Sequence, residues 1–425
     1  MGPGAGRKRP EEENKLTTLA PERQRPETDP PPSTAYPLFL AGMGSWFGAW
    51  GMQIVLFQWL VVEELAESPS RVGTAQMAVL LPSLLFLLLG GAIADRIDRR
   101  RALVKLHLLA GLVCAALGGL VLSGFLSYPL LIGYALVMGT LQALVLPLRD
   151  TQLSDVVKLG MSRAVAGLTM VQHAGQSLGA LAAGLAGVLG SPLVLGIQAI
   201  VVSSGSLAMQ RLPGGQRGLS QPRPRLGMHE LRAGLVEVLR SPLLRPIMLL
   251  NVSVGLVFVG SYLVLLPLLV RELYGGGAEK MGMLAAVLPT GSIAVNLVIM
   301  TRGGVERQGL SLLLGQGFAG LALGTMSFGL PYWGTMLSGV GWGVGAAFAI
   351  NASRTLFQEH ASDENRGRVL SVYSLAILGA APLGALISGF LAERLGTLTT
   401  LALHSVAMTI IILGTLAFSR VREFR

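Results

Sequence analysis

Two long uncharged stretches on either side of a short charged segment limit the folds open to this chain. Residues 72–94 and 106–148 contain no Asp, Glu, Lys or Arg, whereas six of the seven residues 95–101 are charged. A helix crosses the hydrocarbon core of a bilayer with about 20 apolar residues. Each uncharged stretch is therefore long enough to span a membrane. The charged segment between them is typical of a short connection that fixes orientation.

Apolar runs of this length recur along the chain. Hydrophobic residues make up 52% of the 425 residues and charged residues only 13%. A soluble fold of this composition would lack the polar surface to cover its core. We predict an all-α membrane protein with twelve transmembrane helices in two six-helix repeats. The predicted spans are 37–62, 72–94, 102–124, 129–149, 163–188, 192–211, 246–270, 280–301, 309–329, 331–354, 366–391 and 397–419.

Polar segments indicate where the domains begin and end. Residues 1–34 are polar and proline-rich and lack the apolar core of a signal peptide, so we expect a disordered cytoplasmic tail. The longest internal polar stretch, 212–245, is expected to be a cytoplasmic loop. Its residues 229–240 are predicted to form an amphipathic helix on the membrane surface. The two six-helix bundles are then 35–211 and 246–425.

Basic residues are distributed unevenly between the two sides of the predicted spans. Of the 33 Lys and Arg residues, only Arg71, Arg271, Lys280 and Arg394 fall on one side. Because Lys and Arg concentrate in cytoplasmic connections, we expect both termini in the cytoplasm. The bundles also repeat one another, since the sequence Leu-Gly-Ala-Leu at 178–181 recurs 205 residues later. This pattern indicates a duplicated membrane protein.

The charged segment carries a motif, which reads Gly91-x-x-x-Asp95-Arg96-x-x-Arg99-Arg100-x-x-Leu103. It resembles the signature loop between the second and third helices of major facilitator superfamily transporters. Asp98 stands where that loop usually has glycine, which resembles the enterobactin-exporter-like branch of drug and siderophore efflux proteins. The resemblance implies the major facilitator fold, in which two six-helix halves rock about a central site. It also implies a cytoplasmic (inner) membrane of bacteria.

The resemblance gives Asp95 a role as an inner gate. It implies that Asp95 lies at the inner end of the second helix, near the start of the eleventh helix at Arg366. A carboxylate there would accept hydrogen bonds from the free backbone N–H groups of a helix amino terminus. The alternative is a charged loop that serves topology alone. The predicted gating residues are Gly91, Asp95, Arg96, Arg99, Arg100, Arg149, Arg354 and Arg368, of which Arg149 and Arg354 are equivalent by the 205-residue repeat.

Aromatic and polar side chains recur on one face of the first predicted helix at the spacing i, i+4, i+7 and i+11. We interpret this face as the lining of a site for a large, partly apolar ligand. The alternative is ordinary packing between helices. Polar residues deep in other predicted spans extend the candidate site, because they are costly in a membrane. The predicted substrate-binding residues are Trp46, Trp50, Gln53, Phe57, Gln172, Gln176, Asn251 and Asn296.

Proton coupling has few candidate residues, because no Asp or Glu lies in the middle third of any predicted span. His173 lies about ten residues, roughly 15 Å, into its helix and is a candidate protonatable group near the midplane. The alternative is a histidine that only packs against a neighbouring helix. Asp95 and Glu63, at opposite helix ends, are the other candidates for proton coupling.

Glycine and proline are expected to shape two equivalent helices. Exporters of this superfamily carry a Gly-Pro motif in the fifth helix, but here that helix has Gly179 and no proline. The proline lies in the eleventh helix, where Pro382 precedes Gly384, which resembles the enterobactin-exporter-like branch. We predict that these three residues bend or pack their helices.

Other classes of function find little support in the sequence. The single cysteine excludes a disulfide framework and a cysteine metal site, and we expect no metal or cofactor. No Gly-x-x-x-x-Gly-Lys-Ser/Thr loop is present for ATP, and the basic residues lie in helix connections rather than on a nucleic-acid-binding face. No pair of catalytic groups points to an enzyme.

The sequence therefore predicts a secondary active transporter that works by alternating access. We expect it to export an amphipathic small molecule, a drug or a siderophore, by proton antiport, and to act as a monomer in the cytoplasmic (inner) membrane. An importer or a carrier of lipid-like substrates with the same fold is one alternative. A non-transporting membrane receptor or scaffold is the alternative from another class.

Overall fold

The computed structural model describes residues 1–2, 34–94, 98–157, 160–212, 228–302, 305–362 and 366–424, and the described residues contain helices and no strands. The first group of helices is α1 (Ala35–Trp59), α2 (Pro69–Ala94), α3 (Arg99–Leu122), α4 (Tyr128–Val156), α5 (Met161–Ala183), α6 (Ala186–Leu189) and α7 (Ser191–Gln210). The second group is α8 (Met228–Arg240), α9 (Leu244–Ser253), α10 (Leu266–Tyr274), α11 (Ala278–Arg302), α12 (Gln308–Met326), α13 (Tyr332–Glu359), α14 (Arg366–Leu395) and α15 (Thr397–Phe418).

Three π-helical segments and one short 3-10 turn complete these elements. The segment η1 (Leu60–Glu64) continues α1, while η2 (Val254–Val259) and η3 (Ser261–Leu265) join α9 to α10 into one long helical rod. The turn η4 (Val421–Glu423) follows α15.

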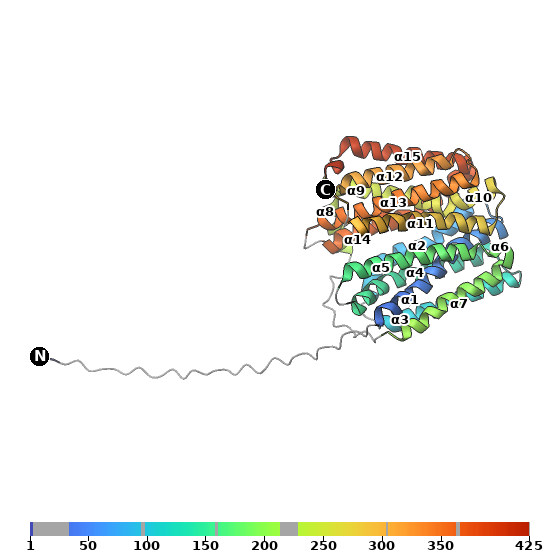
Figure 1. Cartoon of the computed structure of the whole chain (residues 1–425), viewed down its shortest axis with the longest axis horizontal. Helices are drawn as coiled ribbons and strands as arrows, with labels where there is room; N and C mark the ends of the chain where they lie inside the picture. The colour runs from blue at the N-terminus through green and yellow to red at the C-terminus, as the bar shows by residue number, and fades with distance from the viewer. Residues whose placement is uncertain are drawn as a thin grey trace.

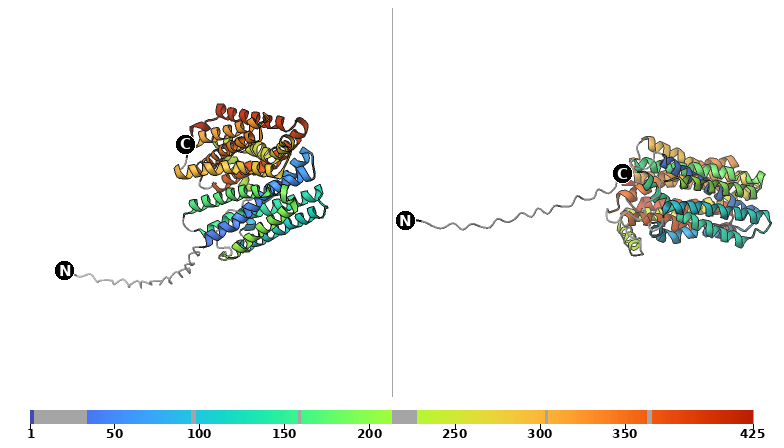
Figure 2. Two further views of the ribbon diagram at one scale, coloured as in Figure 1. Left: turned by 45° about the vertical axis from the view of Figure 1, so that its right-hand side comes forward. Right: turned by 90° about the horizontal axis from the view of Figure 1, so that it is seen from below.

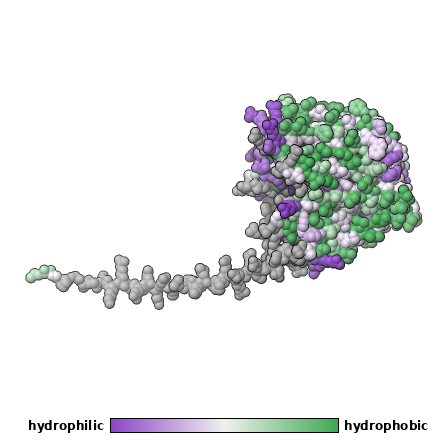
Figure 3. All heavy atoms as spheres, in the orientation of Figure 1, coloured by the Kyte–Doolittle hydropathy of each residue, from purple (hydrophilic) through white to green (hydrophobic). Residues whose placement is uncertain are grey.

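Most of the helices have the length and hydrophobicity of membrane-spanning segments. Nine helical segments of the described chain are long and apolar enough to cross one. Helices α2, α5 and α13 are not among the nine, so the predicted count of twelve spans remains a prediction. Helix α15 is strongly apolar and yet mostly exposed, as expected for a helix that faces lipid. In Figure 3, apolar residues form a broad band on the visible face and hydrophilic residues gather at its ends.

The helices form two groups that lie side by side (Figures 1 and 2). In the amino-terminal half, α1 packs against α5 and α7, α2 against α4, and α3 against α7. In the carboxyl-terminal half, α12 packs against α13 and α15, α11 against α13, and α14 against η2. The predicted helix at 229–240 is present as α8, which packs against α14 and α9. The exact limits of the two halves remain predictions, and most of the predicted tail lies outside the described residues.

The helical body has two ends, at which the helices start and finish. The end where α1 begins and the carboxyl terminus lies is called the terminal face, and the opposite end, where η1, α10 and α14 finish, is called the distal face (Figure 1). The sequence predicts that the terminal face is cytoplasmic.

Two helix pairs join the halves, α2 with α14 and α5 with α11. At the distal end of both pairs, glycines let the backbones approach closely. A Cβ added to Gly73 would lie 2.6 Å from the Ala385 carbonyl oxygen, and one added to Gly282 would lie 2.5 Å from that of Ala180. Small residues at such crossings are the usual means of close packing in lipid, where the hydrophobic effect does not drive helix association. The halves are therefore tightly joined at the distal face.

Candidate functional site

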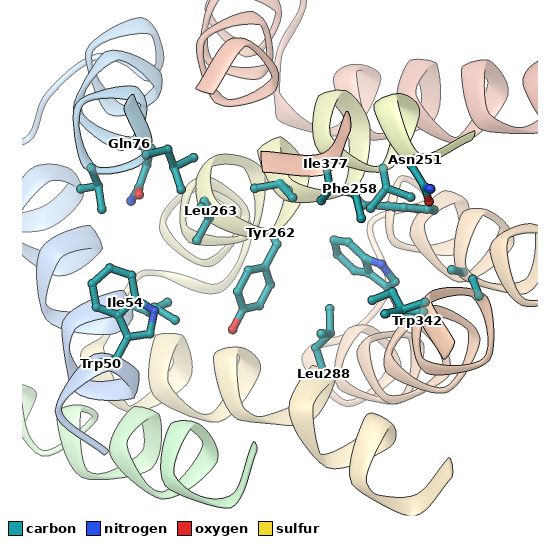
Figure 4. Close-up of a pocket in the computed structure, with 18 of the residues that line it drawn as sticks. Trp50, Ile54, Gln76, Asn251, Phe258, Tyr262, Leu263, Leu288, Trp342 and Ile377 are labelled. Atoms are coloured by element: carbon teal, nitrogen blue, oxygen red, sulfur yellow. The ribbon is translucent and has the colours of Figure 1, made fainter. Parts of the chain in front are cut away.

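A central cavity of about 310 Å³ lies between the two halves. Its wall includes Trp50, Gln53 and Phe57 from α1 and Gln76 from α2. The other half contributes residues of α9, η2, η3, α11, α12, α13 and α14. In Figure 4, Tyr262 projects between Trp50 on one side of the cavity and Trp342 on the other. The described lining residues include no charged side chain.

The π-helical segments η2 and η3 position the aromatic wall of the carboxyl-terminal half. Phe258 of η2 and Tyr262 of η3 both contact Trp342 of α13, with ring centroids 5.5 and 6.3 Å apart. The Tyr262 hydroxyl donates to the Ala285 carbonyl of α11 at 2.9 Å, which fixes the ring. A π-helical turn shifts the side-chain register of a helix, and such turns are frequent at functional sites. This wall presents flat apolar faces to the cavity.

Gln53 is held in a buried network within the amino-terminal half. Its side-chain oxygen accepts a hydrogen bond from the Tyr134 hydroxyl and another from Gln198 Nε2 at 3.1 Å. Gln198 Nε2 also donates to the Ala49 carbonyl at 3.0 Å. The Gln53 Nε2 group has no hydrogen-bond partner among the described residues. Gln53 is therefore firmly oriented and retains a donor that the protein does not satisfy.

Two polar residues of the carboxyl-terminal half that line the cavity differ in whether their side-chain atoms have hydrogen-bond partners. Asn251 and Ser353 exchange two hydrogen bonds, at 2.9 and 3.0 Å, so the Asn251 amide is paired within the protein. Gln316 of α12 is 1% exposed, and its Oε1 atom has no partner among the described residues. Gln53 and Gln316, one from each half, thus each keep one buried amide atom without a partner among the described residues.

The remaining predicted substrate-binding residues lie away from the described cavity lining. Trp46 is buried, and its indole donates to Gln142 Oε1 at 2.7 Å. Gln172 accepts from Arg149 at 3.4 Å. Asn296 accepts from Asn351 Nδ2 at 2.9 Å, within the carboxyl-terminal half. Gln176 lies where α1 and α5 pack closely, since its backbone faces Gly51.

Two of the predicted proton-coupling residues have buried atoms without partners. His173 Nδ1 in α5 and Glu63 Oε1 in η1 are buried and lack a hydrogen bond to any described residue. Asp95, the third candidate, lies outside the described residues. The structure thus leaves two polar atoms of candidate proton-coupling residues without a hydrogen-bond partner among the described residues.

The gating candidates that the structure describes lie toward the terminal face, and Asp95 and Arg96 fall outside the described residues. Arg99 binds both carboxylate oxygens of Asp155 in α4, at 2.9 and 2.7 Å. Arg100 donates to the Gln210 carbonyl at the end of α7. These contacts stay within one half.

The other gating candidates differ from one another in their contacts and exposure. Arg149 donates to Asp150 at 2.8 Å and lies over the Phe47 ring. Arg354, its predicted equivalent, is exposed and forms no hydrogen bond or ion pair with a described residue. Gly91 lies within α2, and Arg368 lies against α8, beside Gly234.

Gly179 and Gly384 occupy equivalent close contacts in the two halves. A Cβ on Gly179 would lie 2.9 Å from Met52 N of α1, and one on Gly384 would lie 2.7 Å from Leu256 Cα of η2. Pro382 is buried inside α14, two residues before Gly384. The predicted packing role thus has a structural basis at both glycines.

The sequence reasoning missed the cavity residues of the carboxyl-terminal half, Phe258, Tyr262, Gln316 and Trp342. One signal was available for Gln316, because it is the only strongly polar side chain between Leu312 and Met326 apart from a threonine. The aromatic residues carried no comparable signal, since aromatic residues occur throughout membrane helices.

Comparison with known proteins identifies the family. The sequence profile of the transmembrane secretion effectors, a family of the major facilitator superfamily, matches residues 34–424. The chain belongs to this family. It is a multi-pass membrane transporter of a small molecule and not an enzyme, as predicted. The predicted all-α class with the major facilitator fold is confirmed, and the count of twelve spans stays a prediction.

Three similar proteins share between 13% and 24% sequence identity with this chain. The staphyloferrin A transporter of Staphylococcus aureus (strain NCTC 8325 / PS 47) is 24% identical over 384 residues, which cover 87% of this chain and 91% of that protein. The crystal structure of the nucleoside transporter NupG has a TM-score of 0.67 at 13% identity, over 91% of this chain and 98% of the other. A POT family transporter in complex with 5-aminolevulinic acid has a TM-score of 0.67 at 15% identity, over 90% and 95%. These two structures share the fold.

Proposed function

We propose that this transporter exports an amphipathic drug or siderophore by proton antiport across the cytoplasmic membrane, with its terminal face inside the cell. The observation that carries the proposal is the central cavity, whose described lining includes aromatic and amide side chains and no charged side chain. The description of the family as secretion effectors supports export. The relative that transports staphyloferrin A supports a siderophore as one of the two substrate classes.

The lining indicates what the cavity would hold. Trp50, Phe258 and Trp342 contribute aromatic rings to the lining, and Gln53 and Gln316 contribute amide side chains from opposite halves, each with one buried atom that lacks a partner. An unsatisfied buried polar group costs about 1–3 kcal/mol, which a bound molecule would recover by hydrogen bonding to it. A flat, largely apolar molecule with a few hydrogen-bonding groups fits this composition. Its binding would connect the two halves.

Proton coupling is assigned to residues outside the described cavity lining, because that lining includes no titratable side chain except Tyr262. His173 is the first choice, since its buried Nδ1 atom lacks a partner and histidine titrates near physiological pH. Asp95 would take part in proton coupling indirectly, by closing the terminal side against the start of α14. Glu63 at the distal face would release the proton on the other side. The protein is proposed to work as a monomer, because one chain contains both halves.

The test is transport by inside-out vesicles that contain the full-length protein. Uptake of a cationic dye and of a catecholate siderophore is measured with and without an imposed proton gradient. Gradient-driven accumulation of either compound is expected, with loss in His173→Ala and in Asp95→Asn. The absence of gradient-driven accumulation for both compounds would overturn proton-coupled export of these classes. Movement in the opposite direction would identify an importer, and binding without flux would identify a receptor.

A further inference from the structure

The start of α2 is capped by a carboxylate from the other half of the protein. Glu393 in the last turn of α14 accepts a hydrogen bond from the Ser70 backbone N–H at 2.8 Å and one from the Ser68 hydroxyl at 3.2 Å. Pro69 is the first residue of α2 and has no N–H, so the Ser70 N–H is the first free donor of that helix. Glu393 thus supplies from the carboxyl-terminal half the acceptor that a helix usually finds close by in its own sequence.

The helix dipoles favour the position of Glu393 beside the start of α2. A carboxylate in the last turn of a helix meets the negative end of its own helix dipole, which is unfavourable. The amino terminus of α2 carries the opposite partial charge and lies beside Glu393. The contact therefore favours the arrangement in which the distal ends of α2 and α14 stay together.

A second contact between the halves places a cation, rather than a carboxylate, at a helix end. Arg271 of α10 donates to the Glu67 carbonyl at 3.1 Å and to the Val62 carbonyl at 3.4 Å. These carbonyls lie in and just after η1, at the carboxyl-terminal end of the first helical rod, where a cation is favoured. The carboxyl-terminal half thus caps one helix end of each polarity in the amino-terminal half.

We propose that Glu393 and Arg271 form a distal clamp, which holds the distal side shut and opens once in each transport cycle. The proposal rests on alternating access, which is part of the proposed function. Helices α2 and α14 run in opposite directions, so each presents its start to the end of the other. The sequence predicts Asp95 at the end of α2 as the carboxylate for the start of α14. Glu393 is the corresponding carboxylate at the other end of the same helix pair.

The clamp is tested by the accessibility of a reporter cysteine in the full-length protein. Gln76 lines the cavity on α2 and is 4% exposed, so Gln76→Cys in a Cys114→Ala background reports opening. A membrane-impermeant maleimide is applied to right-side-out and to inside-out vesicles, which removes any assumption about orientation. Glu393→Ala and Arg271→Ala are each expected to raise the labelling rate from the distal side about two- to fivefold, the range expected for losing one helix-terminus interaction.

Glu64 provides the matched control at the same face. Its carboxylate accepts from Trp59 and Ser191, which belong to its own half, so Glu64→Ala should leave the labelling rate unchanged. Glu393→Gln retains an acceptor oxygen but loses the charge, and should give a smaller increase than Glu393→Ala. Unchanged labelling in both Glu393→Ala and Arg271→Ala would overturn the clamp. Labelling requires no substrate, so failure of the transport assay with the tested compounds would not be confused with failure of the clamp.

Discussion

Gly389 of α14 and Gly73 of α2 lie backbone against backbone at the distal end of the α2–α14 pair. A Cβ added to Gly389 would lie 2.5 Å from the Pro69 carbonyl oxygen and 2.9 Å from Gly73 Cα. Gly184, 205 residues before Gly389, lies just after α5 and meets Gly282 of α11 in a similar way, since a Cβ added to Gly282 would lie 3.1 Å from Gly184 Cα. The closed distal side therefore depends on the absence of side chains at both helix pairs.

Gly389→Val is expected to hold the distal ends of α2 and α14 apart, because its side chain would overlap backbone atoms that cannot move aside. The variant should populate the distal-open state and increase maleimide labelling of Gln76→Cys from that side. Gly414→Val in α15 is the control, since nothing lies within 4 Å of its Cβ position. Equal labelling in the two variants would show that the glycine contact does not govern closure.

Gly179→Val should destabilise the amino-terminal half without favouring either open state. Its Cβ would lie 2.9 Å from both Gly48 C and Met52 N, within the packing of α1 on α5. Overpacking of this kind costs about 1–3 kcal/mol. Thermal unfolding of the protein in detergent measures the loss. Gly119→Ala in α3 has open space and should be neutral or stabilising, because alanine favours a helix over glycine.

The pair of Arg99 and Asp155 should contribute to the stability of the terminal face. The Arg99 side chain is 9% exposed and that of Asp155 is 32% exposed, with the ion pair at 2.7 Å. Removing either partner leaves a partly buried charge without its partner, and we expect a loss of about 1–3 kcal/mol for Arg99→Ala or Asp155→Ala. The double variant should lose less than the sum of the two single variants. Strict additivity would contradict a direct interaction.

The aromatic wall of the cavity should determine substrate affinity. Trp342→Ala removes a ring that contacts both Phe258 and Tyr262, and should raise the KM for a transported compound about tenfold or more, as expected when a buried aromatic anchor is lost. Trp333→Ala, at the start of the same helix, is the matched control because its side chain is 75% exposed. A similar change in KM for both variants would argue against binding at the central cavity.

The sequence predicted the fold class and the helices well, because hydrophobic length and charge are local properties. Three of the four residues predicted on α1 line the cavity, because helical periodicity is also local. Trp50, Gln53 and Phe57 line the cavity, whereas Trp46, one turn earlier on the same face of α1, is covered by α4 and bonds to Gln142. Helical periodicity identifies a face but does not reveal where the neighbouring helix begins to cover it.

Contacts between segments that are far apart in the chain could not be predicted from the sequence. Ser68 and Glu393 are 325 residues apart, and nothing in either local sequence indicates that they meet. The π-helical segments that aim Phe258 and Tyr262 at Trp342 also have no signal in hydrophobic periodicity. Predicted residues such as Asn251 and Asn296 were recognised as polar groups in apolar helices. Whether their partners are protein atoms depends on packing that only the structure gives.

Distances across the two ends of the α2–α14 pair test alternating access most directly. Spin labels at Arg71 and Arg394 report the distal end, and labels at Arg101 and Gly367 report the terminal end, all four positions being exposed. Pulsed dipolar spectroscopy is recorded with and without a transported compound and a proton gradient. We predict that a longer distal distance and a shorter terminal distance gain population together. Distances that change in the same direction, or that do not change in a protein that transports, would contradict alternate opening of the two ends.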